Sequence, residues 1–375
     1  MKILTLSQYL TPRDGWGTSA GNTVRGLVDR GHDVLSLVQT VDPALPFVQK
    51  AVLPGALKTL EQPLHWWKTA KAVDRAITEW TPDVIHVLNE PYALGIALLS
   101  LWRRLPPVAM TACGTYAVLP LFEWKTRWMM KRVYRILTHV FAISNYTQER
   151  ILQALRTISP AFAANVSRKM NVWTLGIESP PVLPPRVKRP EKRLLFVGGI
   201  KPRKGIREII DACGELKRTS SVPLHLDLIG YSPPCAYLDS LHECVRALGL
   251  ETAVTFHGHV SDLELTQAYA NADCFLMLST SHGHHFEGFG LVFLEANARG
   301  IPVIGPRDSG CEDAIAEERS GYLVTPGNPQ EVAERLRWIL EEERIQPEEC
   351  KVWAAEHRIS RQAEEAETVY RSMLR

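Results

Sequence analysis

Short apolar segments alternate with amphipathic helical patterns along the chain, and the alternation starts again after a proline-rich interruption. Apolar runs of this length are typical of strands buried on both faces. Strands that alternate with helices predict a doubly wound parallel sheet. In the first half we predict a helix over Asn22–Asp29 and strands over Lys2–Leu6, Val34–Val38, Val84–Val87, Val108–Thr111, Val140–Ile143 and Met170–Thr174.

The interruption is Ser179–Arg193, which is rich in proline and basic residues and is predicted to be a linker. A chain of 375 residues is too long for one ordinary core and suits two domains of roughly 150 to 200 residues. We therefore expect one α/β domain over residues 1–180 and another over residues 194–355. In the second half, strands are predicted over Leu194–Val197, Leu224–Ile229, Val254–Phe256, Cys274–Leu278 and Pro302–Ile304.

The composition limits the classes of function. The 43 Lys and Arg residues nearly balance the 41 Asp and Glu residues, so no global field draws the chain to nucleic acid. The seven cysteines form no C-x2-C pair, which favours a reduced chain in the cytoplasm. The N-terminus MKILTLSQYL is unlike a signal peptide, and no apolar run reaches the ~18 residues of a membrane span. The longest such run, Ala93–Trp102, is predicted to be a buried helix.

Two glutamates stand eight residues apart in HHFEGFGLVFLEANARGIPVIG. A helix that starts near Gly290 would direct its first amide groups and its positive dipole end towards Glu287, which makes an anion site. Glu295 would face the same cleft about one to two turns further along. The segment thus offers one carboxylate for sugar hydroxyls, a second for a ribose, and amides for a phosphate, which are the parts of a nucleotide-sugar site. The amides are those of Gly288, Phe289, Gly290 and Leu291.

The order of several motifs resembles the donor domain of retaining two-domain (GT-B) glycosyltransferases of family four, the group 1 glycosyl transferases. Besides the glutamate motif, these are LFVGGIKPRKGI, VTFHGHVSDLELTQAYANADCFLMLS, GCEDAI and GYLVTPGNPQEVAERL. The resemblance runs over nearly the whole chain. It implies two Rossmann-like domains that face a central cleft, and a C-terminal helix, residues 356–375, that packs back on the first domain.

The resemblance also implies an activity. The protein would be a retaining hexosyltransferase that needs no metal and no cofactor and takes its sugar from a nucleoside diphosphate sugar. UDP-sugar is the favoured donor and GDP-sugar the alternative. The acceptor would be a saccharide or a lipid-linked saccharide in polysaccharide or glycolipid synthesis. One rival is a nucleotide-sugar-binding regulatory protein with a degraded site. Another, a phosphorylase, would need a pyridoxal-bearing lysine that the sequence does not indicate.

Roles for single residues follow from the same resemblance. Glu287 would hold the 3- and 4-hydroxyls of the sugar, Glu295 the ribose, and Lys204 the diphosphate. The family usually has an arginine where this chain has Gly199, so Arg203 or Lys201 would compensate. Catalytic roles are expected for Glu287, His285 and Lys204, and further donor contacts for Gly15, Gly17, Gly199, Arg203, Gly230 and Val260.

The segment DGWGTSAGN, Asp14–Asn22, is predicted to be a loop between the first strand and the first helix. Its glycines would let the backbone approach a phosphate or a sugar closely. The resemblance implies that this loop closes over the donor. A plain flexible turn is the alternative. A dinucleotide fingerprint fits less well, because the spacing is G-x-G-x-x-x-G and several residues separate it from the strand.

Two further groups of residues depart from simple expectations. His282, His284 and His285 suggest a metal site, but no second cluster of ligands lies near them in the sequence. We expect sugar or phosphate contacts instead, with a bare surface loop as the alternative. In TACGTYAVLP the family often has a histidine at the position of Cys113, which would otherwise be a small core residue. Contacts to the acceptor or sugar are expected from Cys113, Gly114, Thr115 and Tyr116.

The segment Leu121–Leu137, LFEWKTRWMMKRVYRIL, is amphipathic and mixes tryptophans with basic residues. Such a helix can lie in a membrane interface. The alternative is an apolar stripe that packs in the core beneath solvated charges. The first hypothesis places the protein at the inner face of the membrane, and the second leaves it in the cytoplasm.

Overall fold

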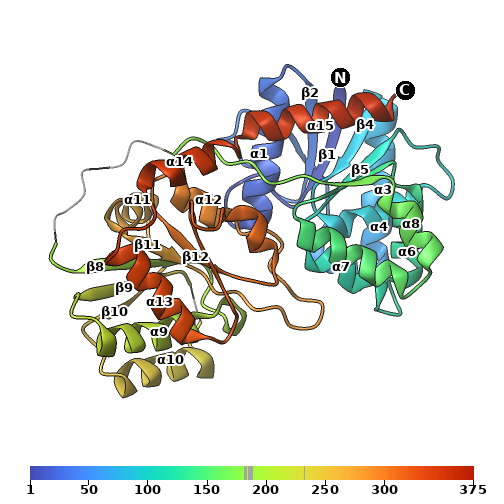
Figure 1. Cartoon of the computed structure of the whole chain (residues 1–375). Coiled ribbons are helices and arrows are strands. Elements are labelled where there is room, and N and C mark those ends of the chain that lie inside the picture. Colours follow the sequence, from blue (N-terminus) through green and yellow to red (C-terminus); the bar gives the residue numbers. More distant parts are fainter. Residues whose placement is uncertain (181–183, 185–188, 232) are drawn as a thin grey trace. The chain divides into compact units, whose positions relative to one another are not determined.

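The computed structural model describes residues 1–180, 184, 189–231 and 233–375 (Figure 1). They form two compact units, of which one comprises Met1–Glu178 with His357–Arg375 and the other Ser179–Glu356. Part of the predicted linker Ser179–Arg193 lies outside the described residues. Its last two residues are not linker, because strand β8 (Lys192–Val197) already begins there.

The first unit is built on a seven-stranded parallel sheet in the order β3-β2-β1-β4-β5-β6-β7. Edge strand β3 (Val48–Ala51) was not predicted, because its residues are mostly exposed and include only two apolar side chains. The predicted strands are confirmed as β1 (Lys2–Ser7), β2 (Asp33–Val38), β4 (Val84–Val87), β5 (Val108–Ala112), β6 (His139–Ala142) and β7 (Met170–Val172).

The segment Asp14–Asn22 is not a loop, so that prediction was wrong. Helix α1 (Gly15–Asp29) begins within it, and the carboxylate of Asp14 caps the helix by accepting a bond from the amide of Gly17 at 3.0 Å. A Cβ on Gly17 would lie only 2.0 Å from the carbonyl oxygen of Thr11. The glycine therefore lets the first turn of the helix pack closely on the chain that follows β1.

The remaining helices of the first unit cover the sheet and the ends of its strands. Ala93–Trp102 is helical only over α4, and Trp102 is half exposed. The helices are α2 (Ala56–Glu61), α3 (Pro63–Trp80), α4 (Ala93–Leu99), α5 (Thr115–Val118), α6 (Arg127–Ile136), α7 (Asn145–Arg156) and α8 (Pro160–Ser167), with short 3-10 turns η1 (Glu90–Tyr92) and η2 (Leu119–Leu121).

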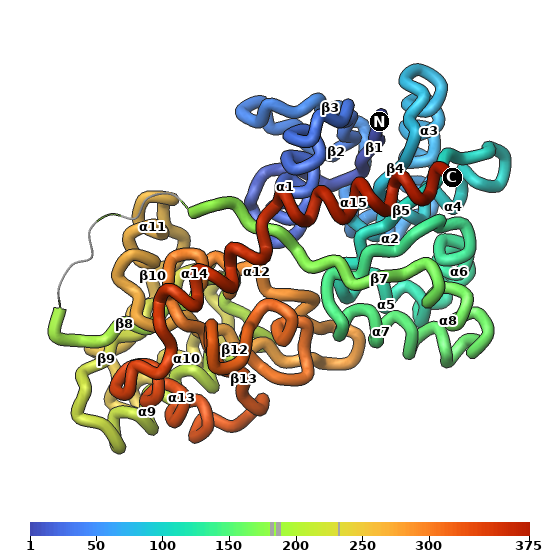
Figure 2. The backbone as a smooth tube through the Cα atoms, turned by 45° about the horizontal axis from the view of Figure 1, so that its top comes forward, coloured from blue at the N-terminus to red at the C-terminus, as the bar shows by residue number. Residues whose placement is uncertain are grey.

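The last helix, α15 (Ile359–Met373), belongs to the first unit although the chain before it lies in the second. Figure 2 shows it beside α1. The contact is close, because a Cβ on Gly26 would lie 2.8 Å from the Cβ of Ala363. The indole N–H of Trp173 donates to the carbonyl of Gln362 at 2.9 Å, and Trp173, Ala366 and Tyr370 are buried in the same core. The C-terminal segment thereby completes the core of the first unit.

The second unit has a six-stranded parallel sheet in the order β10-β9-β8-β11-β12-β13. Strand β13 (Gly321–Val324) was not predicted as a strand, although it is buried, because it is short and begins with glycine. The other strands confirm the prediction: β8, β9 (Leu224–Ile229), β10 (Val254–Gly258), β11 (Cys274–Leu276) and β12 (Val303–Pro306).

Helices follow the strands of this sheet as well. The chain ends in two helices, α14 and α15, of which only α14 belongs to the second unit. The helices are α9 (Ile206–Thr219), α10 (Ala236–Ala247), α11 (Asp262–Asn271), α12 (Leu291–Asn297), α13 (Pro329–Leu340) and α14 (Pro347–Ala355), with 3-10 turns η3 (Pro202–Lys204) and η4 (Gly310–Ala314).

Each sheet has one place where the strand order reverses direction. It lies between β1 and β4 in the first unit and between β8 and β11 in the second. Open α/β sheets bind ligands just outside the carboxyl ends of the strands at such a switch point. The loops that leave β1 and β4, and those that leave β8 and β11, are therefore the places to look for a site.

Candidate active site

The loop after β8 is fixed against the end of β11. The amide of Thr280 donates to the carbonyl of Arg203 at 2.8 Å. Gly205 follows the turn with a φ of +69°, and a Cβ there would lie 2.1 Å from the carbonyl oxygen of Leu278. Only glycine permits this approach, so it holds Arg203 and Lys204 at the switch point.

A single carboxylate oxygen of Glu287 accepts hydrogen bonds from three side chains. Its Oε2 accepts bonds from Lys204 Nζ at 2.8 Å, Arg203 Nη1 at 3.1 Å and Ser279 Oγ at 3.2 Å. Burial of the carboxyl raises its pKa, but the charges and hydrogen bonds of Lys204 and Arg203 outweigh burial and hold the pKa at about 2. Glu287 is thus an ionised anchor between two cations, and the sequence prediction that these residues share a site holds for this cluster.

The backbone around Glu287 is fixed from a second side. The amide of Gly310 donates to the carbonyl of Glu287 at 3.0 Å, and a Cβ on Gly310 would lie 2.0 Å from the carbonyl oxygen of Gly288. Helix α12 begins at Leu291 after Gly290, whose φ is +87°, which confirms the predicted helix start. The chain therefore turns sharply between the two glutamates, as the glycines indicated.

Glu295 lies on α12, but its side chain has other partners. The hydroxyl of Tyr269 donates to Glu295 Oε2 at 3.5 Å. Burial raises the pKa of Glu295, and the charge of Arg299 lowers it in part. Within the described residues, no hydrogen bond or ion pair joins Glu295 to the cluster around Glu287, so its predicted contact with a ribose stays a prediction.

Three glycines mark the ends of β8 and β9. The amide of Gly230 donates to Gly258 at 2.9 Å, and a Cβ on Gly230 would lie 1.8 Å from the carbonyl oxygen of Gly198. Gly199 differs, because a Cβ there would meet only the side chain of Lys201, at 3.5 Å. A larger residue therefore fits at Gly199. Val260, after β10, is partly exposed in the loop that leads to α11.

The histidines before Glu287 form a tight turn. The amides and carbonyls of His282 and His285 exchange hydrogen bonds at 2.8 and 3.0 Å, and both residues are exposed. His284 is partly exposed. In the described part of the chain, no three His, Cys, Asp or Glu side chains gather as a metal-ligand group. The catalytic role predicted for His285 stays a prediction.

In the first unit, Cys113 and Gly114 lie between β5 and α5. Glu90, which follows β4, accepts bonds from the amide of Cys113 at 2.7 Å and from that of Gly114 at 3.2 Å, both on Oε1. The other carboxylate oxygen is buried and has no hydrogen-bond partner. Burial raises the pKa of Glu90 to about 7, against the lowering effect of the amide bonds. We did not select Glu90 from the sequence, although a carboxylate directly after a buried strand at the switch point was a usable signal.

The other residues predicted to contact acceptor or sugar lie beside this turn. Burial raises the pKa of the Cys113 thiol far above its ordinary range, and the charges of Glu90 and Asp14 add to this. The thiol is therefore protonated, and it contacts the carbonyl of Leu88 at 3.7 Å. Thr115 and Tyr116 open helix α5, and the rings of Tyr116 and Trp16 lie 5.2 Å apart.

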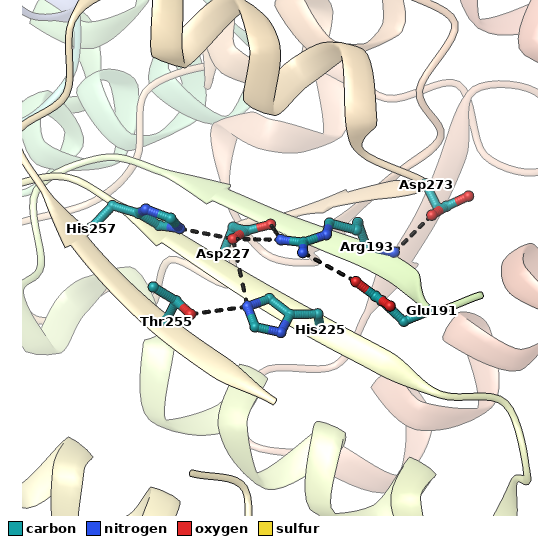
Figure 3. A network of polar contacts seen from close by, with 7 residues as sticks. All are labelled: Glu191, Arg193, His225, Asp227, Thr255, His257 and Asp273. Carbon is teal, nitrogen blue, oxygen red and sulfur yellow. Dashed lines mark hydrogen bonds and ion pairs between the residues drawn. The ribbon is translucent and has the colours of Figure 1, made fainter. Parts of the chain in front are cut away.

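A separate polar network ties β8, β9 and β10 together (Figure 3). At its centre, Asp227 accepts bonds from Arg193 Nη1 at 2.8 and 3.1 Å and from His257 Nε2 at 2.8 Å. These three side chains stand on the strands of the sheet and not in the loops at their carboxyl ends. We assign the network to strand pairing. Its other members are Glu191, His225, Thr255 and Asp273.

The segment Leu121–Leu137 is not one helix, so that description was wrong. Only Arg127–Ile136 is α-helical, and Trp124 lies in the turn before it with 82% of its surface exposed. Trp128 is 55% exposed, whereas Arg132 turns inward and donates to the carbonyl of Ala97 at 3.1 Å. No helix in the described part of the chain is long and apolar enough to cross a membrane.

Comparison with known proteins agrees with this architecture. The family model described as glycosyl transferases group 1 matches residues 184–360, and the model for Glycosyltransferase Family 4 matches residues 13–161. Together the two matches cover most of the chain, one in each unit. The chain belongs to the group 1 glycosyl transferases of glycosyltransferase family four.

Two relatives illustrate the range of the family. The sulfoquinovosyl transferase SQD2 of Arabidopsis thaliana is 25% identical over 275 residues, which are 70% of this chain and 51% of that protein. The GDP-mannose-dependent alpha-(1-6)-phosphatidylinositol monomannoside mannosyltransferase of Mycobacterium tuberculosis is 26% identical over 266 residues, 66% of this chain and 65% of its own. The chain therefore spans about half of the first relative's length and just under two thirds of the second's.

Solved structures show the same fold. The Anabaena protein Alr3699/HepE, in complex with UDP and glucose, superposes with a TM-score of 0.75 at 20% identity, over 99% of this chain and 100% of that one. A glycosyltransferase from Rickettsia africae gives a TM-score of 0.79 at 16% identity, over 100% of this chain and 98% of its own. At such identities the likeness shows the GT-B fold alone, with its two Rossmann-like units.

Proposed function

We propose that the protein transfers a hexose from a nucleoside diphosphate sugar, with retention of anomeric configuration and without a metal ion. The observation that carries the proposal is the cluster of Glu287, Lys204 and Arg203 at the switch point of the second sheet. It offers one fixed carboxylate for sugar hydroxyls and two cations for a diphosphate. A nucleotide sugar presents sugar hydroxyls and a diphosphate on the two sides of the bond that is broken, so it requires both kinds of group.

The charges of the cluster suit a leaving diphosphate. Two cations against one carboxylate leave one net positive charge, in a site where Lys204 and Glu287 each expose only 17% of their side chains. Fixed charges in such a place stabilise the charge that develops on the departing group. The proposed role of Arg203 and Lys204 is therefore the one that a divalent ion would otherwise take, which is the basis for proposing metal independence.

The proposed reaction needs no enzyme nucleophile. A bond forms from the acceptor hydroxyl oxygen to the anomeric carbon, on the face from which the diphosphate leaves. The bond between that carbon and the diphosphate oxygen breaks, and its electron pair remains on the diphosphate. The diphosphate then takes the proton of the acceptor hydroxyl. Glu287 holds the sugar during this exchange, and its low pKa keeps it an acceptor of hydrogen bonds.

The donor is proposed to be a UDP-sugar, with a GDP-sugar as the alternative. The names of known proteins point both ways: the Anabaena structure contains UDP, and the mycobacterial relative is GDP-mannose-dependent. The acceptor is proposed to be a saccharide or lipid-linked saccharide. The name of the mycobacterial relative, a phosphatidylinositol monomannoside mannosyltransferase, favours a lipid-linked acceptor.

A surface of the first unit supports an acceptor that resides in a membrane. Helices α3, α4 and α6 pack side by side. The rings of Trp67 and Trp102 lie 5.4 Å apart, and the ring of Trp66, next to Trp67, lies 6.3 Å from that of Trp128. We call the exposed part of this region the aromatic–basic surface, which consists of Trp67, Trp102, Trp124 and Trp128 with Lys68, Lys71, Arg104, Lys125 and Arg127.

This surface has the chemistry of a membrane interface. Tryptophans combine an apolar ring with a polar N–H, and basic side chains are attracted to anionic lipid. Lys71 lies 5.1 Å from the centre of the Trp67 ring and Lys125 5.5 Å from that of Trp124, so charge and aromatic surface are interleaved. We propose that it docks on the cytoplasmic face of an anionic membrane.

The test of the proposed function is a thermal-shift panel followed by donor hydrolysis. Uridine, guanosine and adenosine diphosphate sugars are compared, since a ligand that binds the folded state raises its stability by mass action. The best donor is then incubated with enzyme, and free nucleoside diphosphate is measured. Slow release without acceptor, lost in Glu287→Gln, supports a transferase. Donor binding with no release under any condition supports the alternative of a regulatory binding protein.

A further inference from the structure

The ends of β1, β4 and β5 are joined by two consecutive side chains. Asn89 accepts bonds on Oδ1 from the amide of Gln8 at 2.7 Å and from the hydroxyl of Ser7 at 3.0 Å. Its neighbour Glu90 points the other way along the sheet and accepts bonds from two amides at the end of β5. Both side chains are 1% exposed. Asn89 therefore fixes the loop after β1, and Glu90 fixes the loop after β5.

The turn that Glu90 holds combines an unusual backbone conformation with a very short helix. Gly114 has a φ of +139° and a ψ of −117°, which side chains with a Cβ rarely adopt. It precedes α5, a helix of four residues that is too short to be stable by itself. The two amide bonds to Glu90 Oε1 hold the backbone directly before Thr115 and Tyr116, and the hydroxyl of Tyr134 holds α5 further along through the carbonyl of Ala117 at 2.8 Å.

A glutamate is a costly choice for such a constraint. A buried polar atom without a partner costs free energy, and a buried charge costs more. Glu90 leaves Oε2 buried and unpartnered, although the two amides need only one oxygen. An uncharged side chain would hold them at lower cost. Costs of this kind persist where function requires them, which points to a role beyond folding.

We propose that Glu90 is a positioning residue for sugar transfer, because it fixes the Cys113–Tyr116 segment in the orientation that meets the transferred sugar. The proposal rests on the proposed function and on the contact with sugar or acceptor that the sequence predicts for this segment. Glu90 itself is buried, with 1% of its surface exposed. It acts through the backbone of Cys113 and Gly114.

The first arm of the test is hydrogen exchange, which needs no substrate. In Glu90→Ala, the amides of Cys113 and Gly114 lose their acceptor, and exchange in peptides covering Thr111–Val118 is expected to rise about five- to tenfold. Glu90→Gln keeps an amide oxygen and is expected to restore much of the protection. Ser36→Ala is the control, a buried change on β2 that removes the acceptor of the Thr5 hydroxyl and should leave these peptides unchanged.

The second arm separates positioning from general damage. With the donor that the thermal-shift panel selects, Glu90→Ala is expected to lower kcat for release of nucleoside diphosphate about tenfold or more. Affinity for the nucleoside diphosphate, which is proposed to bind in the other unit, should change less than about twofold. Glu90→Gln should recover part of kcat. Ser36→Ala, adjusted to equal thermal stability by the assay temperature, should keep the wild-type kcat.

The outcomes distinguish the two proposals. If the wild-type protein releases nucleoside diphosphate and Glu90→Ala does so at the same rate, the role of Glu90 is disproved and the proposed function stands. Unchanged exchange in Thr111–Val118 would disprove it as well. If the wild-type protein turns over no donor, the proposed function fails and the inference about Glu90 fails with it.

Discussion

The hydroxyl of Tyr370 lies 2.5 Å from Nδ1 of His86, although 284 positions separate the two residues. The other ring nitrogen of His86 lies 2.8 Å from Oγ1 of Thr111. A neutral imidazole has one donor and one acceptor nitrogen, so both bonds can form together. The last helix is thereby tied to β4 and β5 at the centre of the first sheet.

This arrangement predicts an acid-sensitive first unit. Burial lowers the pKa of His86 to about 3, with a contribution from His139. Because the folded pKa lies below the unfolded value of about 6.5, only the unfolded chain takes up this proton as pH falls. Stability is therefore full above about pH 6.5 and falls by up to about 1.4 kcal/mol per pH unit down to pH 3.

Chemical denaturation at pH 7 and pH 5 measures this effect. Protonation of His86 in the unfolded chain should lower the unfolding free energy of the wild type by about 2 kcal/mol between pH 7 and pH 5. His86→Gln should lose less between the same two pH values. Tyr370→Phe is the companion variant, which leaves His86 able to titrate and costs about 1 to 3 kcal/mol at pH 7 through the unpaired nitrogen. Equal pH dependence in wild type and His86→Gln would contradict the assignment.

The two glutamates of the motif should respond differently to substitution. Glu287→Gln leaves Lys204 and Arg203 free for a diphosphate but weakens the hold on the sugar, so nucleoside diphosphate should bind at least as well while turnover falls. Glu295→Gln should weaken nucleoside diphosphate and intact donor alike if Glu295 holds the ribose, by about 1.5 to 3 kcal/mol for one charged hydrogen bond. Calorimetric titration of both variants decides this. Equal losses of nucleoside diphosphate affinity would refute the assignment.

The parts of the fold that were predictable depend on neighbouring residues in the sequence. The parallel strands were predictable from their apolar runs, and the start of α12 was predictable from Gly290. The N-terminus of α1 was missed because Gly17 and Gly21 are present for tight packing against Thr11 and Leu10, contacts that depend on how the chain folds back after β1. Strand β3 was missed because an exposed edge strand has no apolar run.

The same difference between local and distant contacts applies to the candidate site. The sequence assigned Glu287, Arg203 and Lys204 to one predicted site, but it did not indicate that Glu287 would take both cations as direct partners, since Arg203 lies 84 positions away. Nor could the sequence indicate that Glu295 would lie beside Tyr269. Such pairings depend on how loops from different strands meet at the edge of the sheet. Glu90 escaped notice for this reason, because its partners Cys113 and Gly114 follow another strand.

Gly199 provides a test of the charge in the donor site. Its backbone is outside the left-handed region, and a Cβ meets only Lys201 at ordinary contact distance, so Gly199→Arg should fold normally. An added cation beside a diphosphate should tighten nucleoside diphosphate binding about tenfold, as one charge-assisted bond of about 1.5 kcal/mol would do. Gly199→Gln is the control of similar size without charge. Equal affinities for both variants would place the diphosphate elsewhere.

Activity should survive removal of divalent ions. Arg203 and Lys204 are proposed to stabilise the leaving diphosphate, so transfer or donor hydrolysis should proceed at more than about half its rate after chelation. The measurement is release of nucleoside diphosphate with and without an excess of chelator. Activity that is abolished by the chelator and restored by a divalent ion would overturn metal independence.

The aromatic–basic surface should bind anionic vesicles. Each basic residue near such a membrane contributes about 1 kcal/mol, and salt screens this attraction. Cosedimentation with phosphatidylserine-containing vesicles should therefore be strong at low salt, weaker at high salt and absent with neutral vesicles. Lys125→Glu with Arg127→Glu should reduce binding, because both side chains are exposed.

The choice of these two residues follows from the structure. Arg132, on the same helix, donates to Ser100 and Ala97, so its replacement would disturb packing as well as charge. Arg189→Glu with Arg246→Glu makes the same change in charge on exposed residues of the second unit and serves as the control. If the control loses as much binding as Lys125→Glu with Arg127→Glu, net charge and not this surface governs the contact. Failure of the wild type to bind at low salt would leave a soluble saccharide as the proposed acceptor.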